Sequence, residues 1–110
     1  MSTKVYTETS PARLLLVDDH PLLRRAVAEL LSLESDLSVV GQASNGQEAL
    51  DFLAKNDVDL VILDHKMPIL TGMETLKEIK ARNFNTKTIL FSVSDLSLIH
   101  ISEPTRLRRI

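Results

Sequence analysis

The sequence predicts an α/β fold in which helices wind around both faces of a parallel β-sheet. Short apolar runs of strand length alternate with helical stretches of roughly 10 to 15 residues, which is the pattern of βαβ crossovers. The first and third runs each stop abruptly at acidic residues. No apolar run approaches the length of about 20 residues that a membrane-spanning helix needs. The 110 residues are therefore expected to form one domain in the cytoplasm, without a membrane partner.

The first half of the chain predicts two strands and two helices in alternation. Residues 13–17 are rich in leucine and end at two acids, as expected of a strand buried on both faces. Pro21 suits the start of a helix, and apolar residues at one-face spacing continue that helix to Leu31. A second strand is predicted at residues 37–43, where the strand pattern is weaker. The turn residues at 44–46 then start a short second helix.

The second half repeats the alternation and then stops. A third apolar strand covers residues 58–63 and ends at Asp64. A third helix is predicted at 72–81 and a fourth strand at 86–93, whereas residues 96–110 show neither a helical stripe nor a turn that leads to a strand. The expected fold is a doubly wound, flavodoxin-like sheet that is incomplete after its fourth strand, with that strand as an open edge.

Composition excludes several classes of function. With no Cys there is no disulfide, thiolate nucleophile or cysteine metal site, and three scattered His argue against a histidine site. Residues 1–95 carry 10 Lys and Arg against 14 Asp and Glu, whereas residues 96–110 carry three Arg against one Glu. An acidic body lacks the basic face of nucleic-acid-binding domains. We therefore expect no direct nucleic-acid binding by this chain, and the absence of Gly-rich phosphate loops argues against nucleotide binding.

Acidic residues follow two of the predicted strands. Asp18, Asp19 and Asp64 should converge, because the carboxyl ends of neighbouring parallel strands share one edge of the sheet. For one acid alone, a strand end or solvated turn is a sufficient explanation, but three converging carboxylates repel unless a cation joins them. Oxygen ligands suit Mg²⁺ or Mn²⁺. With a hydroxyl from Ser92 at the same edge, a carboxylate could attack a phosphoryl group and form an acyl phosphate.

Four motifs resemble the receiver domain of two-component response regulators. They are LLVDDHPLLR at 15–24, ASNG at 43–46, LDHKMP at 63–68 followed by GME at 72–74, and ILFSVS at 89–94. The first and last motifs resemble the nitrate/nitrite regulators, a group with a C-terminal helix-turn-helix output domain. The resemblance covers residues 13–95 and implies the CheY-like form of the flavodoxin-like fold.

The resemblance implies a role for each candidate residue. Asp64 is implied as the phosphoacceptor and Ser92 as the switch hydroxyl that bonds the phosphoryl group. Asp19 is implied as a direct ligand of Mg²⁺ or Mn²⁺, with Asp18 as its partner, acting through water. Asp64 and the main-chain carbonyl of Lys66 complete the implied metal site. The implied phosphoryl donor is a sensor histidine kinase.

The resemblance also has departures. His65 stands where the family usually has an aliphatic residue, which we interpret as a packing variant, and Ile69-Leu70 replaces the commoner Gly-Met. Pro68 and Gly72 match the loop positions that shape the turn after the acceptor. Nothing matches the family's fourth helix, fifth strand with its lysine, or fifth helix.

The end of the chain resembles something else. Residues 96–106 are similar to a translated sequencing adapter, which predicts a truncated reading frame. The expected organisation is an N-terminal tail at 1–12, a truncated receiver domain at 13–95 and a non-native tail at 96–110.

The first hypothesis for function is a phosphorylation-controlled receiver, not an enzyme, that regulates an output domain absent from this chain. Transcription is the expected output, and the resemblance also allows a homodimer of the intact protein. One alternative is an aspartate-nucleophile phosphatase, but Lys66 stands where that chemistry needs a second acid. The other alternative is a phosphorylation-independent interaction domain, which loss of Mg²⁺ binding would favour.

Overall fold

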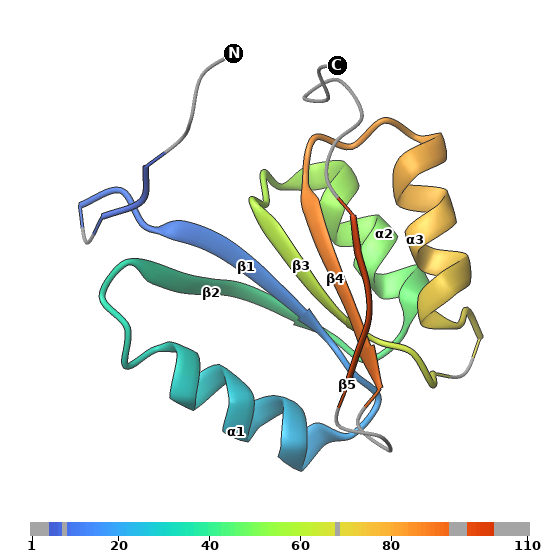
Figure 1. The fold of residues 1–110 in the computed structure, drawn as a ribbon, viewed down its shortest axis with the longest axis horizontal. Coiled ribbons are helices and arrows are strands. Elements are labelled where there is room, and N and C mark those ends of the chain that lie inside the picture. Colours follow the sequence, from blue (N-terminus) through green and yellow to red (C-terminus); the bar gives the residue numbers. More distant parts are fainter. Residues whose placement is uncertain (1–4, 8, 68, 93–96, 103–110) are drawn as a thin grey trace.

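The computed structural model describes residues 5–7, 9–67, 69–92 and 97–102. Figure 1 shows a twisted sheet whose strands lie in the order β2-β1-β3-β4-β5. The strands are β1 (Ala12–Val17), β2 (Leu37–Ala43), β3 (Leu60–Asp64), β4 (Lys87–Ser92) and β5 (Ser97–Ser102). The helices are α1 (Pro21–Leu31), α2 (Gly46–Lys55) and α3 (Gly72–Ala81). The first four strands are parallel to their neighbours, and β5 is antiparallel to β4.

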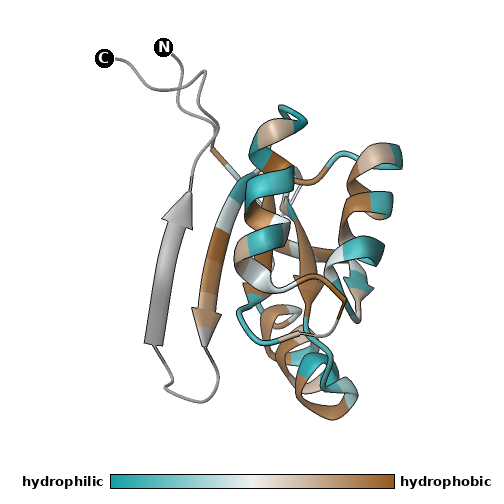
Figure 2. Cartoon of the chain, turned by 90° about the vertical axis from the view of Figure 1, so that its right-hand side faces the viewer, coloured by the Kyte–Doolittle hydropathy of each residue, from teal (hydrophilic) through white to brown (hydrophobic). Residues whose placement is uncertain are grey.

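Helices cover both faces of this sheet. Alternate residues of β1 and β3, among them Val17 and Leu63, pack against α2 and α3 in one buried cluster that includes Leu50 and Ile79. On the opposite face, Val27 of α1 lines a small cavity with strand residues. The strands that Figure 2 colours by hydropathy are mostly hydrophobic, whereas the helices mix hydrophilic and hydrophobic residues. None of the helices in the described ranges is long and apolar enough to cross a membrane.

Local sequence signals place the helix starts. Pro21 occupies the first turn of α1, as predicted. The side chain of Asn45 accepts a hydrogen bond from the backbone N–H of Glu48 and caps α2. Thr71 and Glu74 form a reciprocal capping box at the start of α3. The predicted parallel pairing of the first four strands and the three predicted helices are confirmed, with β3 beginning at Leu60 rather than at residue 58.

The expectation of an open edge at β4 is wrong. Residues 97–102 form β5 and pair with β4, with Leu90 opposite His100. Only four residues separate the two strands, and a parallel crossover needs about a dozen, so the added strand is necessarily antiparallel. The segment contains two isoleucines, and β-branched residues favour strands.

Ile69 has a backbone conformation that its side chain disfavours. Its φ is 73°, in the left-handed region, which costs a residue with a Cβ about 1 to 2 kcal/mol. The side chain is 74% exposed, so its removal loses little packing. We expect Ile69→Gly to raise the free energy of unfolding by about 1 kcal/mol in urea titrations, after the entropy cost of glycine. Asn83→Gly is the matched control, because Asn83 has φ 59° but asparagine tolerates this region, so equal gains would contradict the explanation.

Candidate functional site

The carboxyl ends of β1 and β3 lie side by side. Val17 is in register with Leu63, so the acids that follow them leave the sheet at the same edge. The backbone N–H of Asp18 donates to the carbonyl of Ala43 at 3.0 Å, which continues the pairing of β1 with β2 by one residue. Asp64 is itself the last residue of β3. The sheet register therefore brings together the acids that the sequence indicated.

The structure gathers four side chains at this edge. Asp18, Asp19, His20 and Asp64 each offer one ligand atom, and these atoms all lie within 4.8 Å of one another. Asp64 is 2% exposed and Asp18 is 5% exposed, whereas His20 is on the surface. The structure therefore shows the predicted convergence of the three acids.

Hydrogen bonds fix the orientation of Asp18. Its Oδ1 accepts a hydrogen bond from the backbone N–H of His20 at 2.9 Å and lies 2.7 Å from His20 Nδ1. Its carbonyl accepts from Nη1 of Arg24 at 2.6 Å, and Nε of Arg24 donates to Gln42 at 3.2 Å. The loop between β1 and α1 is thereby tied both to α1 and to β2.

Burial and like charge shift the proton equilibria of the cluster. Burial is the largest cause that raises the pKa of Asp64, and the negative charge of Asp18 adds to it. A long hydrogen bond of 3.4 Å from the backbone N–H of Lys66 to Asp64 Oδ1 acts in the opposite direction. The hydrogen bond to Asp18, followed by the charge of Asp19, raises the pKa of His20.

Two carboxylate oxygens in the cluster are buried without hydrogen bonds. Within the described part of the chain, neither Asp64 Oδ2 nor Asp19 Oδ1 accepts a hydrogen bond of good geometry, although His20 Nδ1 lies 3.0 Å from Asp19 Oδ1. A buried acceptor without a donor is costly, and a divalent cation held by carboxylates removes that cost. Asp18, Asp19 and Asp64 therefore fit a hard cation such as Mg²⁺ or Mn²⁺.

The raised pKa of Asp64 predicts how stability depends on pH when divalent cations are absent. The folded state binds the Asp64 proton more tightly than the unfolded state, so this contribution is present at low pH and is lost as pH rises through the folded pKa. Near neutral pH, Asp64→Asn should raise the free energy of unfolding by about 1 to 3 kcal/mol. Thermal unfolding in the presence of a chelator should show that the difference in stability between the variant and the parent shrinks as the solution is acidified. A stability difference that does not change with pH would contradict this role of the Asp64 proton.

The other predicted residues are placed less completely. Lys66 is exposed, and the ligand role of its carbonyl stays a prediction. Ser92 is the last residue of β4, but its side chain is outside the described part of the structure. Pro68 is also outside the described residues. The Nδ1 of His65 is buried without a hydrogen-bond partner among the described residues, and it is not part of the cluster.

His20 is the site residue that sequence reasoning missed. The scattered positions of the three histidines argued against any histidine site, yet the fold places His20 Nδ1 3.0 Å from Asp19 Oδ1 and 3.9 Å from Asp64 Oδ2. Its position directly after Asp18 and Asp19 was the available signal.

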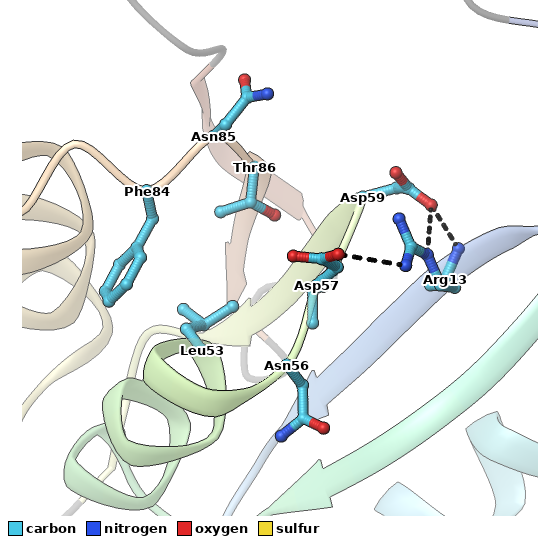
Figure 3. A pocket seen from close by; sticks show the side chains of 9 residues that line it. Arg13, Leu53, Asn56, Asp57, Asp59, Phe84, Asn85 and Thr86 are labelled. Atoms are coloured by element: carbon cyan, nitrogen blue, oxygen red, sulfur yellow. Dashed lines mark hydrogen bonds and ion pairs between the residues drawn. The ribbon is translucent and has the colours of Figure 1, made fainter.

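A separate pocket of about 280 Å³ lies at the opposite edge of the sheet, near the starts of β1, β3 and β4 (Figure 3). None of the predicted site residues lines it. Arg13 makes three polar contacts beside this pocket. Its backbone N–H donates a hydrogen bond to Asp59 Oδ2 at 2.8 Å, and its Nε donates to the same oxygen at 3.3 Å. Its Nη1 lies 3.7 Å from Asp57 Oδ2. These contacts tie β1 to β3. Open parallel sheets bind ligands at the carboxyl edge, so the acidic cluster remains the candidate site.

Comparison with known proteins gives consistent matches. The profile of the family described as "Response regulator receiver domain" matches residues 14–100. The nitrate/nitrite response regulator protein NarL of Escherichia coli (strain K12) is 42% identical over 85 residues, which are 77% of this chain and 39% of that protein. The chain thus spans about two fifths of the length of this relative.

Two solved structures are similar in fold as well as sequence. The signal receiver domain of the putative response regulator NarL from Mycobacterium tuberculosis gives a TM-score of 0.71 at 33% identity, covering 74% of this chain and 66% of that one. The response regulator protein TrrA from Thermotoga maritima, in complex with Mg²⁺-BeF, gives 0.65 at 37% identity, covering 77% and 76%.

Proposed function

The chain belongs to the response regulator receiver domain family, and from this premise we propose that it accepts a phosphoryl group on Asp64. One observation carries the proposal. Asp64 is almost fully buried at the carboxyl edge of the sheet, and its Oδ2 accepts no hydrogen bond from the described residues. A carboxylate oxygen has two lone pairs, so Oδ2 keeps one for attack on phosphorus even when the other contacts a cation.

The proposed reaction transfers a phosphoryl group between two atoms. Oδ2 of Asp64 attacks phosphorus, a new oxygen–phosphorus bond forms, and the bond from phosphorus to the donor breaks, with its electron pair leaving on the donor. The product is an acyl phosphate of Asp64. Asp18 and Asp19, with Asp64 and the carbonyl of Lys66, would hold Mg²⁺ or Mn²⁺, which supplies positive charge against the phosphoryl oxygens.

Further residues and partners are proposed from the family relationship. The hydroxyl of Ser92, at the end of β4, would donate a hydrogen bond to the phosphoryl group. The donor would be a sensor histidine kinase in the cytoplasm. Because the chain spans only 39% of its NarL relative, an output domain that controls transcription would lie in the rest of the intact protein. We retain 13–95 as the proposed receiver boundaries and 96–110 as a proposed non-native tail.

The proposal is tested by incubating the chain with an acyl phosphate donor and Mg²⁺. Intact-mass measurement should show a single phosphoryl adduct that hydroxylamine removes, as it does an acyl phosphate, and that does not form with a chelator. An unmodified chain under conditions where it is folded would reject the proposal. Sustained turnover of a simple phosphate ester would instead favour the phosphatase alternative.

A further inference from the structure

We infer that the imidazole of His20 is a metal ligand and that it gives this site a preference for late first-row transition ions, such as Co²⁺ or Zn²⁺, over Mg²⁺. This inference rests on the proposed function, because it concerns the same carboxylate site. It adds a nitrogen donor to a set that otherwise consists of oxygens.

His20 directs its ring at the carboxylates rather than at the helix that it precedes. It is the N-cap residue of α1, but its side chain makes no capping hydrogen bond to that helix. The imidazole is instead directed at the carboxylates, with Nδ1 2.7 Å from Asp18 Oδ1 and 3.0 Å from Asp19 Oδ1. The backbone N–H of His20 also donates to Asp18, so the main chain and side chain of one residue both face the cluster.

The donor atoms of His20, Asp18 and Asp19 have the spacing of neighbouring ligands around one ion. Two adjacent ligands of a small divalent ion, each bonded at about 2.1 Å, lie about 3 Å apart. The distances from His20 Nδ1 to the oxygens of Asp18 and Asp19 have this size, and Asp64 Oδ2 is 3.9 Å away. One ion therefore can contact the nitrogen and the oxygens with small side-chain adjustments.

One carboxylate oxygen of Asp64 is buried and unsatisfied among the described residues. Asp64 is 2% exposed, and its Oδ2 lies 3.9 Å from His20 Nδ1 without a hydrogen bond from the described residues. The His20 ring approaches this oxygen but does not satisfy it. A cation between the ring and the carboxylates would satisfy both sides at once.

The chemistry of the donors decides which cation benefits. Mg²⁺ prefers oxygen ligands and gains little from a nitrogen, whereas imidazole suits the later first-row ions. The side chain of His20 is 59% exposed, so it can adjust to an incoming ion without repacking the core. The imidazole thus raises affinity selectively for the transition ion.

The test compares Co²⁺ and Mg²⁺ binding to the full chain by calorimetric titration. His20→Asn replaces the imidazole with an amide whose oxygen still suits Mg²⁺. We expect it to weaken Co²⁺ binding by about tenfold or more and Mg²⁺ binding by less than about twofold. The Co²⁺ complex of the parent should also show a paramagnetically shifted imidazole N–H proton signal, which His20→Asn removes.

His65→Asn is the matched control, because His65 follows Asp64 directly but is not part of the four-residue group. It should leave the ratio of the two affinities and the shifted signal unchanged. Equal weakening of both ions by His20→Asn, or no change in either, would overturn the inference while leaving the carboxylate site intact. If Asp19→Ala left Mg²⁺ binding unchanged, the proposed metal site itself would fail.

Discussion

Asp64→Asn is expected to abolish phosphoryl uptake from both an acyl phosphate and a histidine kinase. Asparagine keeps the size and shape of the side chain. Its neutral amide, however, lacks the negative charge that makes a carboxylate oxygen a nucleophile. Asp64 is the last residue of β3 and is 2% exposed, so the rigid sheet holds the substituted side chain in the position of the original one. Intact-mass measurement should find less than about one hundredth of the parent's adduct, since loss of a catalytic group commonly costs several powers of ten.

Loss of folding cannot mimic this result, because the same change is expected to stabilise the chain by removing a buried charge. Asp51→Asn is the matched control: Asp51 is exposed on α2, where it accepts a hydrogen bond from Gln47, and its variant should be phosphorylated like the parent. An adduct of normal amount and lifetime in Asp64→Asn would show that another residue is the acceptor. Peptide mapping would then identify that residue.

The sequence predicted the parts of the fold that periodicity controls. Leucine-rich runs that end at Asp18 and Asp64 locate two strands, and the common edge of parallel strands then requires their acids to meet. Helix α1 was predictable because Pro21 and a one-face apolar stripe give two independent signals. The convergence of the three acids followed from these elements without any knowledge of side-chain contacts.

Other features depend on tertiary geometry that local patterns do not contain. The pairing of β5 with β4 depends on an available strand edge and a short connection, not on a strong strand pattern in 97–102. The role of His20 depends on which way the loop after β1 turns. Ile69, in the loop between β3 and α3, has a positive φ although isoleucine disfavours it. Composition, which counts histidines and glycines, cannot resolve such positions.

Gly72 is a position where close packing decides the residue. It is the first residue of α3, and its N–H donates to the carbonyl of His65 at 3.0 Å. A Cβ at this position would meet Leu90 Cδ1, the carbonyl oxygen of Asp64 at 2.5 Å and Cα of His65 at 2.9 Å. Two of these three atoms belong to the backbone, in the last residue of β3 and in the residue that follows it. They cannot rotate away as the end of a side chain can.

Gly72→Ala is therefore expected to lower the free energy of unfolding by about 3 kcal/mol, at the upper end of the usual cost of overpacking. Without the clash, alanine would favour the helix by up to about 1 kcal/mol, so the two explanations predict opposite signs. Gly41→Ala is the matched control, because the three atoms nearest to its added Cβ all belong to the ring of Phe52, a side chain that can move, so the loss of stability should be smaller. Urea titrations of the three proteins decide between these outcomes. The atoms that the added methyl group displaces include the backbone of Asp64. Phosphoryl uptake should therefore fall even at temperatures where the variant is still folded. Normal uptake by a stable Gly72→Ala variant would show that α3 does not hold the acceptor in place.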